Sequence, residues 1–248
     1  STIPLLIGAV EHWRGLGAEL GVDLEVKLTG GLLVAETGAQ MSAIERKAVI
    51  ERAAGLDVSL LSRSELGRAA PYISPRMVGG ALVPVEGKAN PLIATPALAH
   101  GAKAHGARFG LGLDVHAIEP TPSGYCVETT GGRIECERIV NCAGTAAGRI
   151  STLVGVELPV ESHPLQAHVT EPVAPLVSHL VAFAGDLLTV KQAAVGSILI
   201  GGGWPAEVDG DSGQLVVSEA SLRSNLVVAQ HVIPALSQAR LQRIWTGA

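Results

Sequence analysis

A serine in the C-terminal part of the chain has the neighbours of a protease nucleophile. The segment Gly210-Asp211-Ser212-Gly213 matches the tetrapeptide around a chymotrypsin-type serine. That chemistry also needs an upstream histidine as the base and an aspartate that orients the histidine. No Ala-Ala-His-Cys-like segment occurs in the chain, and the serine lies in a stretch rich in Gly and Asp. We therefore interpret the segment as a surface turn.

The same stretch begins like a calcium-binding loop, at Asp209-x-Asp211. Position 6 of such a loop is Gln214 here instead of glycine, and the bidentate acid would fall on Ala220. The eight histidines of the chain include no His-x-x-x-His pair with an acid. The sequence therefore predicts no metal site.

Three glycine-rich segments are candidates for a phosphate-binding loop. Gly110-Leu111-Gly112 lacks the third glycine of the dinucleotide-binding fingerprint. Gly201-Gly202-Gly203 follows an expected strand but leads to Trp204-Pro205 instead of a helix. Gly87-Lys88 does not have the spacing of a P-loop. By motif alone, the chain has no site for a nucleotide phosphate.

Composition excludes several classes of protein. The 248 residues include 18 Lys and Arg against 23 Asp and Glu, a net charge of −5, with 47% hydrophobic and only 17% charged residues. Mean hydropathy is +0.36, which is too apolar for a disordered chain. The acidic balance and the absence of a basic run argue against nucleic acid as a partner.

We expect no membrane span and a cytoplasmic protein. The longest uncharged stretches, Pro172–Gly185 and Gln192–Ala206, are broken by Gly or Pro and are shorter than a spanning helix. Ser1–Leu6 has no basic segment before its apolar residues, so we expect no secretory leader. The three cysteines form no Cys-x-x-Cys pair, and we interpret them as reduced thiols.

Apolar spacing predicts an α+β fold with a mixed, largely antiparallel sheet and helices on one face. The expected helices cover residues 2–20, 42–54, 64–70, 90–105, 146–154 and 218–232. The expected strands cover residues 23–30, 32–36, 58–61, 77–85, 107–111, 115–119, 125–130, 133–141, 163–170, 187–192, 197–202 and 240–245. We expect 23–30 to pair with 32–36, and glycines at 131–132 and 196 to turn two hairpins.

The order of several short segments resembles the D-amino-acid oxidase family of flavoenzymes, nearest to its glycine oxidase, sarcosine oxidase and hydrogen cyanide synthase branch. The segments are Trp13-x-x-Leu16, Thr29-Gly30-Gly31-Leu32-Leu33-Val34-Ala35, Leu60-Leu61-Ser62-x-x-Glu65-Leu66, Pro71-Tyr72-Ile73-Ser74, Asn90-Pro91, Arg138-Ile139-Val140-Asn141-Cys142-Ala143-Gly144, Leu199-Ile200-Gly201-Gly202, Pro234-Ala235-Leu236 and Trp245-x-Gly247. Each segment alone is weak, but the series spans nearly the whole chain in the family's order.

Two parts of the family pattern are absent from this sequence. Members begin with a strand, a Gly-x-Gly-x-x-Gly turn and a helix that holds the FAD pyrophosphate, and they continue past the Trp-x-Gly segment. We therefore expect an internal fragment. By the resemblance, 1–88 and 159–248 are the two parts of a substrate-binding domain, and 89–158 is the central part of an FAD-binding domain.

The resemblance also assigns cofactor positions. In the family, the backbone of a strand valine pairs with the adenine edge, and the matching residue is Val115. Cys142, Ala143 and Gly144 match the small residues of a turn beside the flavin. FAD is thus the cofactor implied for the complete protein, although we expect this fragment alone to bind none.

The substrate positions are assigned in the same way. Lys191 and Gln192 match polar positions that face the substrate above the flavin. Gln166 and His168 share one strand face and could line the same pocket. No residue is assigned as a catalytic base, because direct hydride transfer from a neutral amine to the flavin needs none.

The resemblance implies an enzyme that oxidises the C–N bond of a small amino acid or N-substituted glycine to an imine by hydride transfer to FAD. One alternative is a flavin hydroxylase or another FAD oxidoreductase of related topology. Another is a non-catalytic module for ligand binding or subunit assembly. Since residues 89–158 would pack against the absent FAD-binding unit, we also expect self-association or a partner subunit to cover an apolar surface.

Overall fold

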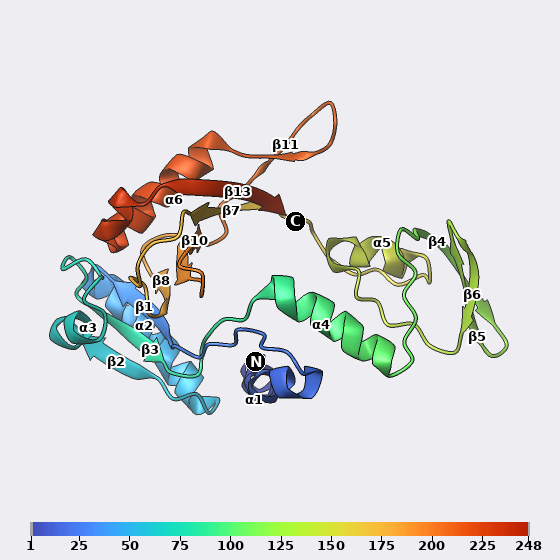
Figure 1. The fold of residues 1–248 in the computed structure, drawn as a ribbon, viewed down its shortest axis with the longest axis horizontal. Coiled ribbons are helices and arrows are strands. Elements are labelled where there is room, and N and C mark those ends of the chain that lie inside the picture. The colour runs from blue at the N-terminus through green and yellow to red at the C-terminus, as the bar shows by residue number, and fades with distance from the viewer. Residues whose placement is uncertain (1, 248) are drawn as a thin grey trace. The chain divides into compact units, whose positions relative to one another are not determined.

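The computed structural model describes residues 2–247. In it, two segments that are far apart in the sequence fold together into one unit (Figure 1). Unit 1 consists of the residues up to Ala102 together with Pro164–Gly247, and unit 2 of Lys103–His163. The break between the two units lies in the last turn of helix α4 (Pro91–Ala104), and the expected division into substrate-binding and FAD-binding parts at residues 88 and 158 stays a prediction.

Unit 1 is built on an eight-stranded sheet in the order β13-β7-β10-β9-β8-β1-β3-β2. The strands are β1 (Gly31–Ala35), β2 (Ser59–Ser62), β3 (Gly79–Val83), β7 (Leu165–Thr170), β8 (Leu180–Phe183), β9 (Thr189–Gln192), β10 (Ile198–Gly201) and β13 (Leu241–Gly247). Only β1 and β8 pair in parallel; every other neighbouring pair is antiparallel. The α+β class with a mixed, largely antiparallel sheet is confirmed.

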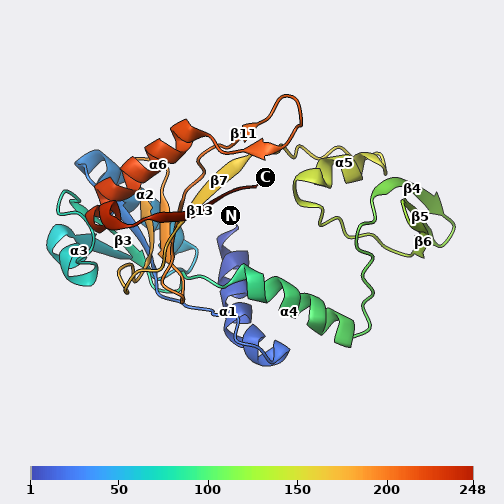
Figure 2. The same cartoon turned by 45° about the horizontal axis from the view of Figure 1, so that its top comes forward.

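One face of this sheet is covered by helices α6 (Glu219–Val232) and α3 (Arg63–Ala69), and Figure 2 shows α6 running along the strands. We call it the covered face. Its core contains Val34, Val181, Val190 and Ile200 from four neighbouring strands, packed with Ala229 of α6. Ala229 and Ile233 lie one turn apart on the apolar side of α6, and both are fully buried.

Helix α2 (Gly38–Ala53) covers the β1–β3 end of the opposite face, so helices lie on both sides of the sheet. It begins four residues before the expected start, because Thr37 and Gln40 form a capping box. Ile44 and Ala48 point inward and are buried. Val49 does not, because its side chain is 65% exposed.

The rest of that opposite face stays accessible. We call it the open face and define it by Ala167, Ala182, Thr189, Lys191, Leu199 and Trp245. These residues alternate along their strands with residues of the covered face and are half-buried or exposed.

The segment before β1 is the main error of the sequence prediction. No strand forms over 23–30, where Lys27 makes only an isolated bridge with Lys88. The Asp23 carboxylate accepts a hydrogen bond from the backbone N–H of Glu25, and Glu25 adopts a left-handed φ of 54°. This local turn breaks the strand, and β1 pairs with β3 and β8 instead.

Helix α1 (Ile3–Leu20) ends as the sequence predicts, at a left-handed Gly21. Beyond the large sheet, β11 (Glu207–Val208) and β12 (Leu215–Val216) form a small ribbon that encloses Ser212. The Ser212 hydroxyl donates to the Asp209 carboxylate at 2.6 Å, with no histidine partner among the described residues, as in the surface turn predicted here.

Unit 2 is a three-stranded antiparallel meander followed by a short helix. Its elements are β4 (Val115–Thr121), β5 (Gly124–Thr129), β6 (Gly132–Cys136), the 3-10 turn η1 (Gly144–Ala146) and α5 (Ala147–Thr152). The strand expected over 107–111 does not form, and β6 stops short of the expected residue 141.

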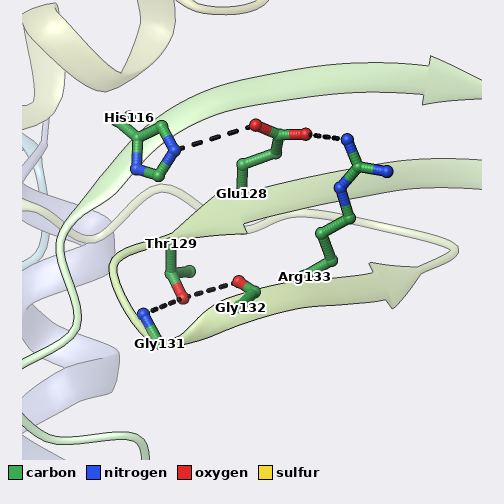
Figure 3. A network of polar contacts seen from close by, with 6 residues as sticks. All are labelled: His116, Glu128, Thr129, Gly131, Gly132 and Arg133. Carbon is green, nitrogen blue, oxygen red and sulfur yellow. Dashed lines mark hydrogen bonds and ion pairs between the residues drawn. The ribbon is translucent and has the colours of Figure 1, made fainter.

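Figure 3 shows the side chains that hold the meander together. Glu128 accepts from Arg133 Nη2 at 2.5 Å and lies 3.7 Å from His116 Nε2, so three strands are joined by one carboxylate. The Thr129 hydroxyl donates to the Gly132 carbonyl at 2.7 Å and fixes the predicted glycine turn.

None of the helices among residues 2–247 is long and apolar enough to cross a membrane. Within the same residues, no group of three or more His, Cys, Asp or Glu side chains is arranged to hold a metal ion.

Candidate functional site

Gln166 and His168 lie on the covered face of unit 1, beneath α6. Their exposed fractions are 3% and 0%. The Gln166 amide binds both backbone groups of Ser218, accepting from its N–H at 2.8 Å and donating to its carbonyl at 3.1 Å. This pairing fixes the orientation of the amide, so its nitrogen faces His168 Nε2 at 3.1 Å.

The Gln166 amide and Asn225 together determine the tautomer of His168. Nδ1 lies 3.0 Å from the Asn225 amide oxygen, and the Asn225 nitrogen donates to the Gly201 carbonyl at 3.1 Å. His168 is therefore neutral, with the proton on Nδ1 and an acceptor at Nε2. Burial lowers the pKa of His168, and the bond to Asn225 only partly offsets this effect. The network attaches α6 to the sheet and leaves no free group for a substrate.

Gln192 also lies on the covered face, because it alternates with Lys191. Its amide oxygen accepts from the N–H groups of Leu176 and Val177 at 2.7 and 3.0 Å. Its nitrogen donates to the carbonyls of residues 173, 174 and 196 at 2.9–3.2 Å. The side chain holds a loop in place. The geometry therefore does not support substrate contact by Gln166, His168 or Gln192.

Lys191 is the expected substrate residue that does lie on the open face. Its Cα pairs with Leu199 of β10, and Thr189 lies two residues earlier on the same face of β9. The side chain is half-buried, and its ammonium has no hydrogen bond or ion pair among residues 2–247. A single cation on a surface of small and apolar side chains can orient an anionic ligand that lies flat on the sheet.

Lys88 adds a second cation near Lys191. Its ammonium donates to the backbone carbonyl of Gln192, the residue after Lys191. Burial lowers the pKa of Lys88, and the positive charges of Lys191 and Lys27 lower it further. Sequence reasoning missed this residue because 104 positions separate it from its partner.

A cavity of about 190 Å³ lies between α2 and the sheet, lined mainly by apolar groups such as Leu33, Ile44 and Ala182. Glu86, one of its two acidic residues, folds over Gly31, where a Cβ atom would collide with the carboxylate. Burial raises the pKa of Glu86, an effect that the nearby Lys47 opposes.

In unit 2, the predicted cofactor residues Cys142, Ala143 and Gly144 lie at the turn into η1, where Ala143 and Gly144 are exposed. Asn141 holds this turn, since its amide nitrogen donates to the Ala147 carbonyl at 2.9 Å and its oxygen accepts from the Ala143 N–H at 3.2 Å. Gly144 has a φ of 57° and open space where a Cβ would stand. A turn of small, exposed side chains fits the close approach of a planar group such as a flavin.

Val115 opens β4 and is linked to the same turn through α5. Arg149 of α5 donates to the Val115 carbonyl at 3.0 Å and lies 3.9 Å from the Asp114 carboxylate. Unit 2 therefore places its two expected cofactor positions on elements that contact each other.

A family model described as FAD dependent oxidoreductase matches residues 1–248, the whole chain. The beta chain of sarcosine oxidase from Rhizobium meliloti is 28% identical over 96% of this chain and 58% of its own length. Glycine oxidase of Geobacillus kaustophilus is 26% identical over 99% of the chain and 65% of its own. The chain thus spans about three fifths of the length of these curated relatives.

Solved structures show the same fold. The crystal structure of glycine oxidase from Geobacillus kaustophilus superposes with a TM-score of 0.88 at 23% identity, covering 99% of this chain and 66% of that one. L-proline dehydrogenase from P. horikoshii gives 0.86 at 25% identity, covering 96% and 64%. The family match extends over every segment described above, and its members use FAD. This chain belongs to the family of FAD-dependent oxidoreductases that includes the glycine and sarcosine oxidases.

Proposed function

We propose that this chain is part of an enzyme that oxidises the C–N bond of a small amino acid or N-substituted glycine to an imine. The relatives named as sarcosine oxidase, glycine oxidase and L-proline dehydrogenase support this substrate class. In the reaction, the carbon next to nitrogen loses a hydride and the nitrogen loses a proton.

The observation that carries the proposal is the open face of unit 1. Its apolar residues, among them Leu199 and Ala182, exclude water from a flat ligand, while Lys191 supplies one unpaired cation. This combination suits a small amine with a carboxylate, which needs an apolar contact for its carbon chain and a positive charge at one end.

The turn of unit 2 carries the second part of the proposal. Cys142, Ala143 and Gly144 would border the FAD, and the backbone of Val115 would bind its adenine edge. FAD supplies the two-electron acceptor that takes up the hydride. In this proposal the residues of the chain bind and orient the substrate. None of the side chains that define the open face is placed as a base to take a proton from the substrate carbon.

The test is the visible spectrum of the full-length protein that carries this chain, with FAD bound. D-amino acids, glycine, L-proline and N-methylglycine are added anaerobically, and bleaching of the flavin band identifies the substrate class. Reduction by an amine is the expected result. If NAD(P)H reduces the flavin and no amine does, the hydroxylase alternative replaces this proposal. A full-length protein that binds no FAD would favour a non-catalytic module.

We also propose that the protein assembles with a further polypeptide or with itself. Two of its relatives, from sarcosine oxidase and opine oxidase, are named as subunits of their enzymes. Unit 2 exposes many large apolar side chains for its size, with Leu111 86% and Val140 83% exposed. Light scattering of this chain is expected to show a mass above the monomer, which the double variant L111K/V140K reduces. A monomer at high concentration would contradict self-association.

A further inference from the structure

Glu86 reaches over the sheet of unit 1 from the turn that follows strand β3. Its backbone holds this turn beside β1, because the Glu86 N–H donates to the Val83 carbonyl at 3.2 Å and the Glu86 carbonyl accepts from the Gly30 N–H at 2.9 Å. The side chain folds over Gly31, where a Cβ atom would lie only 2.9 Å from the Glu86 Cβ and would displace the carboxylate. The glycine at position 31 therefore makes room for an acid on the sheet.

Glu86 lies on the same side of the sheet as Lys191. Gly31 belongs to the side of the open face, because the next residue, Leu32, points into the core of the covered face. Gly31 pairs with Leu180 of β8, and the register of β8 with β9 places Lys191 beside Leu180. Neighbouring strands lie about 4.8 Å apart, so roughly 10 Å separates the backbone of Lys191 from that of Gly31. A carboxylate and an ammonium group thus flank the same stretch of sheet.

The Glu86 carboxylate has no partner of its own. It accepts no hydrogen bond and forms no ion pair among the residues that the structure describes, whereas Glu51, the second acid of the same cavity, is paired with Lys47. Ala182 and Thr189 of the open face line this cavity together with Glu86, so the cavity connects the acid to that face. Burial raises the pKa of Glu86, Lys47 opposes this increase, and Glu51 adds to it. A half-buried, unpaired carboxylate is costly unless a cation joins it.

The proposed reaction needs a group that takes a proton from nitrogen. An alkylammonium ion has a pKa of about 10, so an amine arrives at neutral pH with a proton on its nitrogen lone pair. The adjacent carbon can release a hydride only after that proton has left, because the lone pair forms the second bond of the imine. Lys191 is the one titratable side chain among those that define the open face, and its positive charge repels an ammonium ion. Glu86, at the border of this face, attracts it.

We propose that the Glu86 carboxylate binds the ammonium group of the substrate and accepts its proton before the oxidation. This inference rests on the proposed amine oxidation and assigns the proton that the nitrogen loses. The N–H bond breaks, its electron pair stays on nitrogen, and an O–H bond forms on Glu86. The neutral amine can then release the hydride of the adjacent carbon, and Glu86 returns its proton to water after the imine has left. Lys191, across the same stretch of sheet, holds the carboxylate of the substrate.

The experiment follows flavin reduction in the full-length, FAD-bound protein by anaerobic stopped flow between pH 7 and pH 10, with the amine that reduces it best. The measured quantity is the second-order rate constant at low amine concentration. The wild type uses the ammonium form, so its rate constant should stay nearly constant over this range. In E86Q only the neutral amine in solution reacts. Its rate constant should be lower by about a hundredfold or more at pH 7 and should rise about tenfold per pH unit toward the wild-type value.

E51Q is the matched control, because it removes the same charge from the same cavity, but from an acid that is already paired with Lys47. Its pH profile should match that of the wild type. FAD content and thermal unfolding show whether each variant folds.

Two results with the variants would overturn the inference, namely an E86Q profile parallel to that of the wild type, or an E51Q profile like that of E86Q. A wild-type rate constant that itself rises about tenfold per pH unit would also overturn it, and this measurement does not require E86Q to fold. If no amine reduces the wild-type flavin at any pH, the proposed function itself has failed.

Discussion

The imidazole Nδ1 of His168 lies 3.0 Å from the amide oxygen of Asn225, across the contact between strand β7 and helix α6. Both residues are fully buried. Since Nε2 accepts from Gln166, a second proton on the ring would place two donors against each other. The fold therefore requires the neutral ring, and this requirement links the stability of unit 1 to pH.

Acidification is expected to destabilise the chain. Burial lowers the pKa values of His168 and His179 in the folded state, while in the unfolded state both are near 6.5. Below that pH the unfolded chain binds protons that the folded chain does not, so the free energy of unfolding falls as pH decreases. The maximum slope is about 1.4 kcal/mol per pH unit for each histidine. The two contributions are fully present only above the unfolded pKa.

Urea unfolding between pH 8 and pH 5 measures this slope. The variant H168Q should retain the part of the slope that His179 contributes and lose the part that His168 contributes. An identical slope in H168Q and the wild type would show that His168 is not responsible.

Removing Asn225 should cost far more than removing a neighbour on the outside of the same helix. N225A leaves the buried Nδ1–H of His168 without its partner and removes the hydrogen bond to the Gly201 carbonyl. We expect a loss of about 2–4 kcal/mol in the free energy of unfolding. R223A removes an exposed ion pair with Glu219 and should cost about 0.5 kcal/mol or less. Equal losses in the two variants would contradict this assignment.

Local sequence patterns predicted where helices and strands form better than they predicted which strands pair. The hairpin of β9 and β10 follows from two apolar runs around Gly196, which adopts a left-handed φ of 95°. Strand β8 was missed because Leu180–Phe183 lies in an uncharged stretch without alternation. The alternation at 23–30 predicted a strand, but the hydrogen bond from Glu25 to Asp23 determines that backbone.

The candidate site was only partly predictable for a similar reason. The sequence places Lys191 and Gln192 side by side, and alternation shows that they face opposite sides. It does not show which side is covered, because α6 and the loop at 173–177 reach the face of Gln192 through long-range packing. Lys88 and Asn225 carry no motif, and only their distant partners reveal their roles.

Substitutions at Gln192 and at Lys191 should therefore differ sharply in their effect on the free energy of unfolding. Q192A removes five hydrogen bonds, four to the loop of residues 173–177 and one to Gly196, and we expect it to lose about 2–4 kcal/mol. Q192E should be at least as destabilising, because its carboxylate would face three carbonyl oxygens. K191M, on the open face, should change stability by less than about 1 kcal/mol.

Denaturant unfolding gives these values, and limited proteolysis should cut the 173–177 loop faster in Q192A. A stable Q192A with an unchanged proteolytic pattern would restore Gln192 as a candidate substrate residue.

The turn of unit 2 provides a direct test of the FAD position. Ala143 is exposed, so A143L should leave the thermal stability of the chain nearly unchanged. In the full-length protein the added side chain would occupy the space proposed for the flavin, and the ratio of flavin to protein absorbance should fall several-fold. A143S adds only one oxygen atom and should retain FAD. Fluorescence quenching of added FAD measures the change in affinity. An A143L protein that binds FAD as tightly as A143S would place the cofactor elsewhere, because the larger leucine side chain would then not meet the flavin.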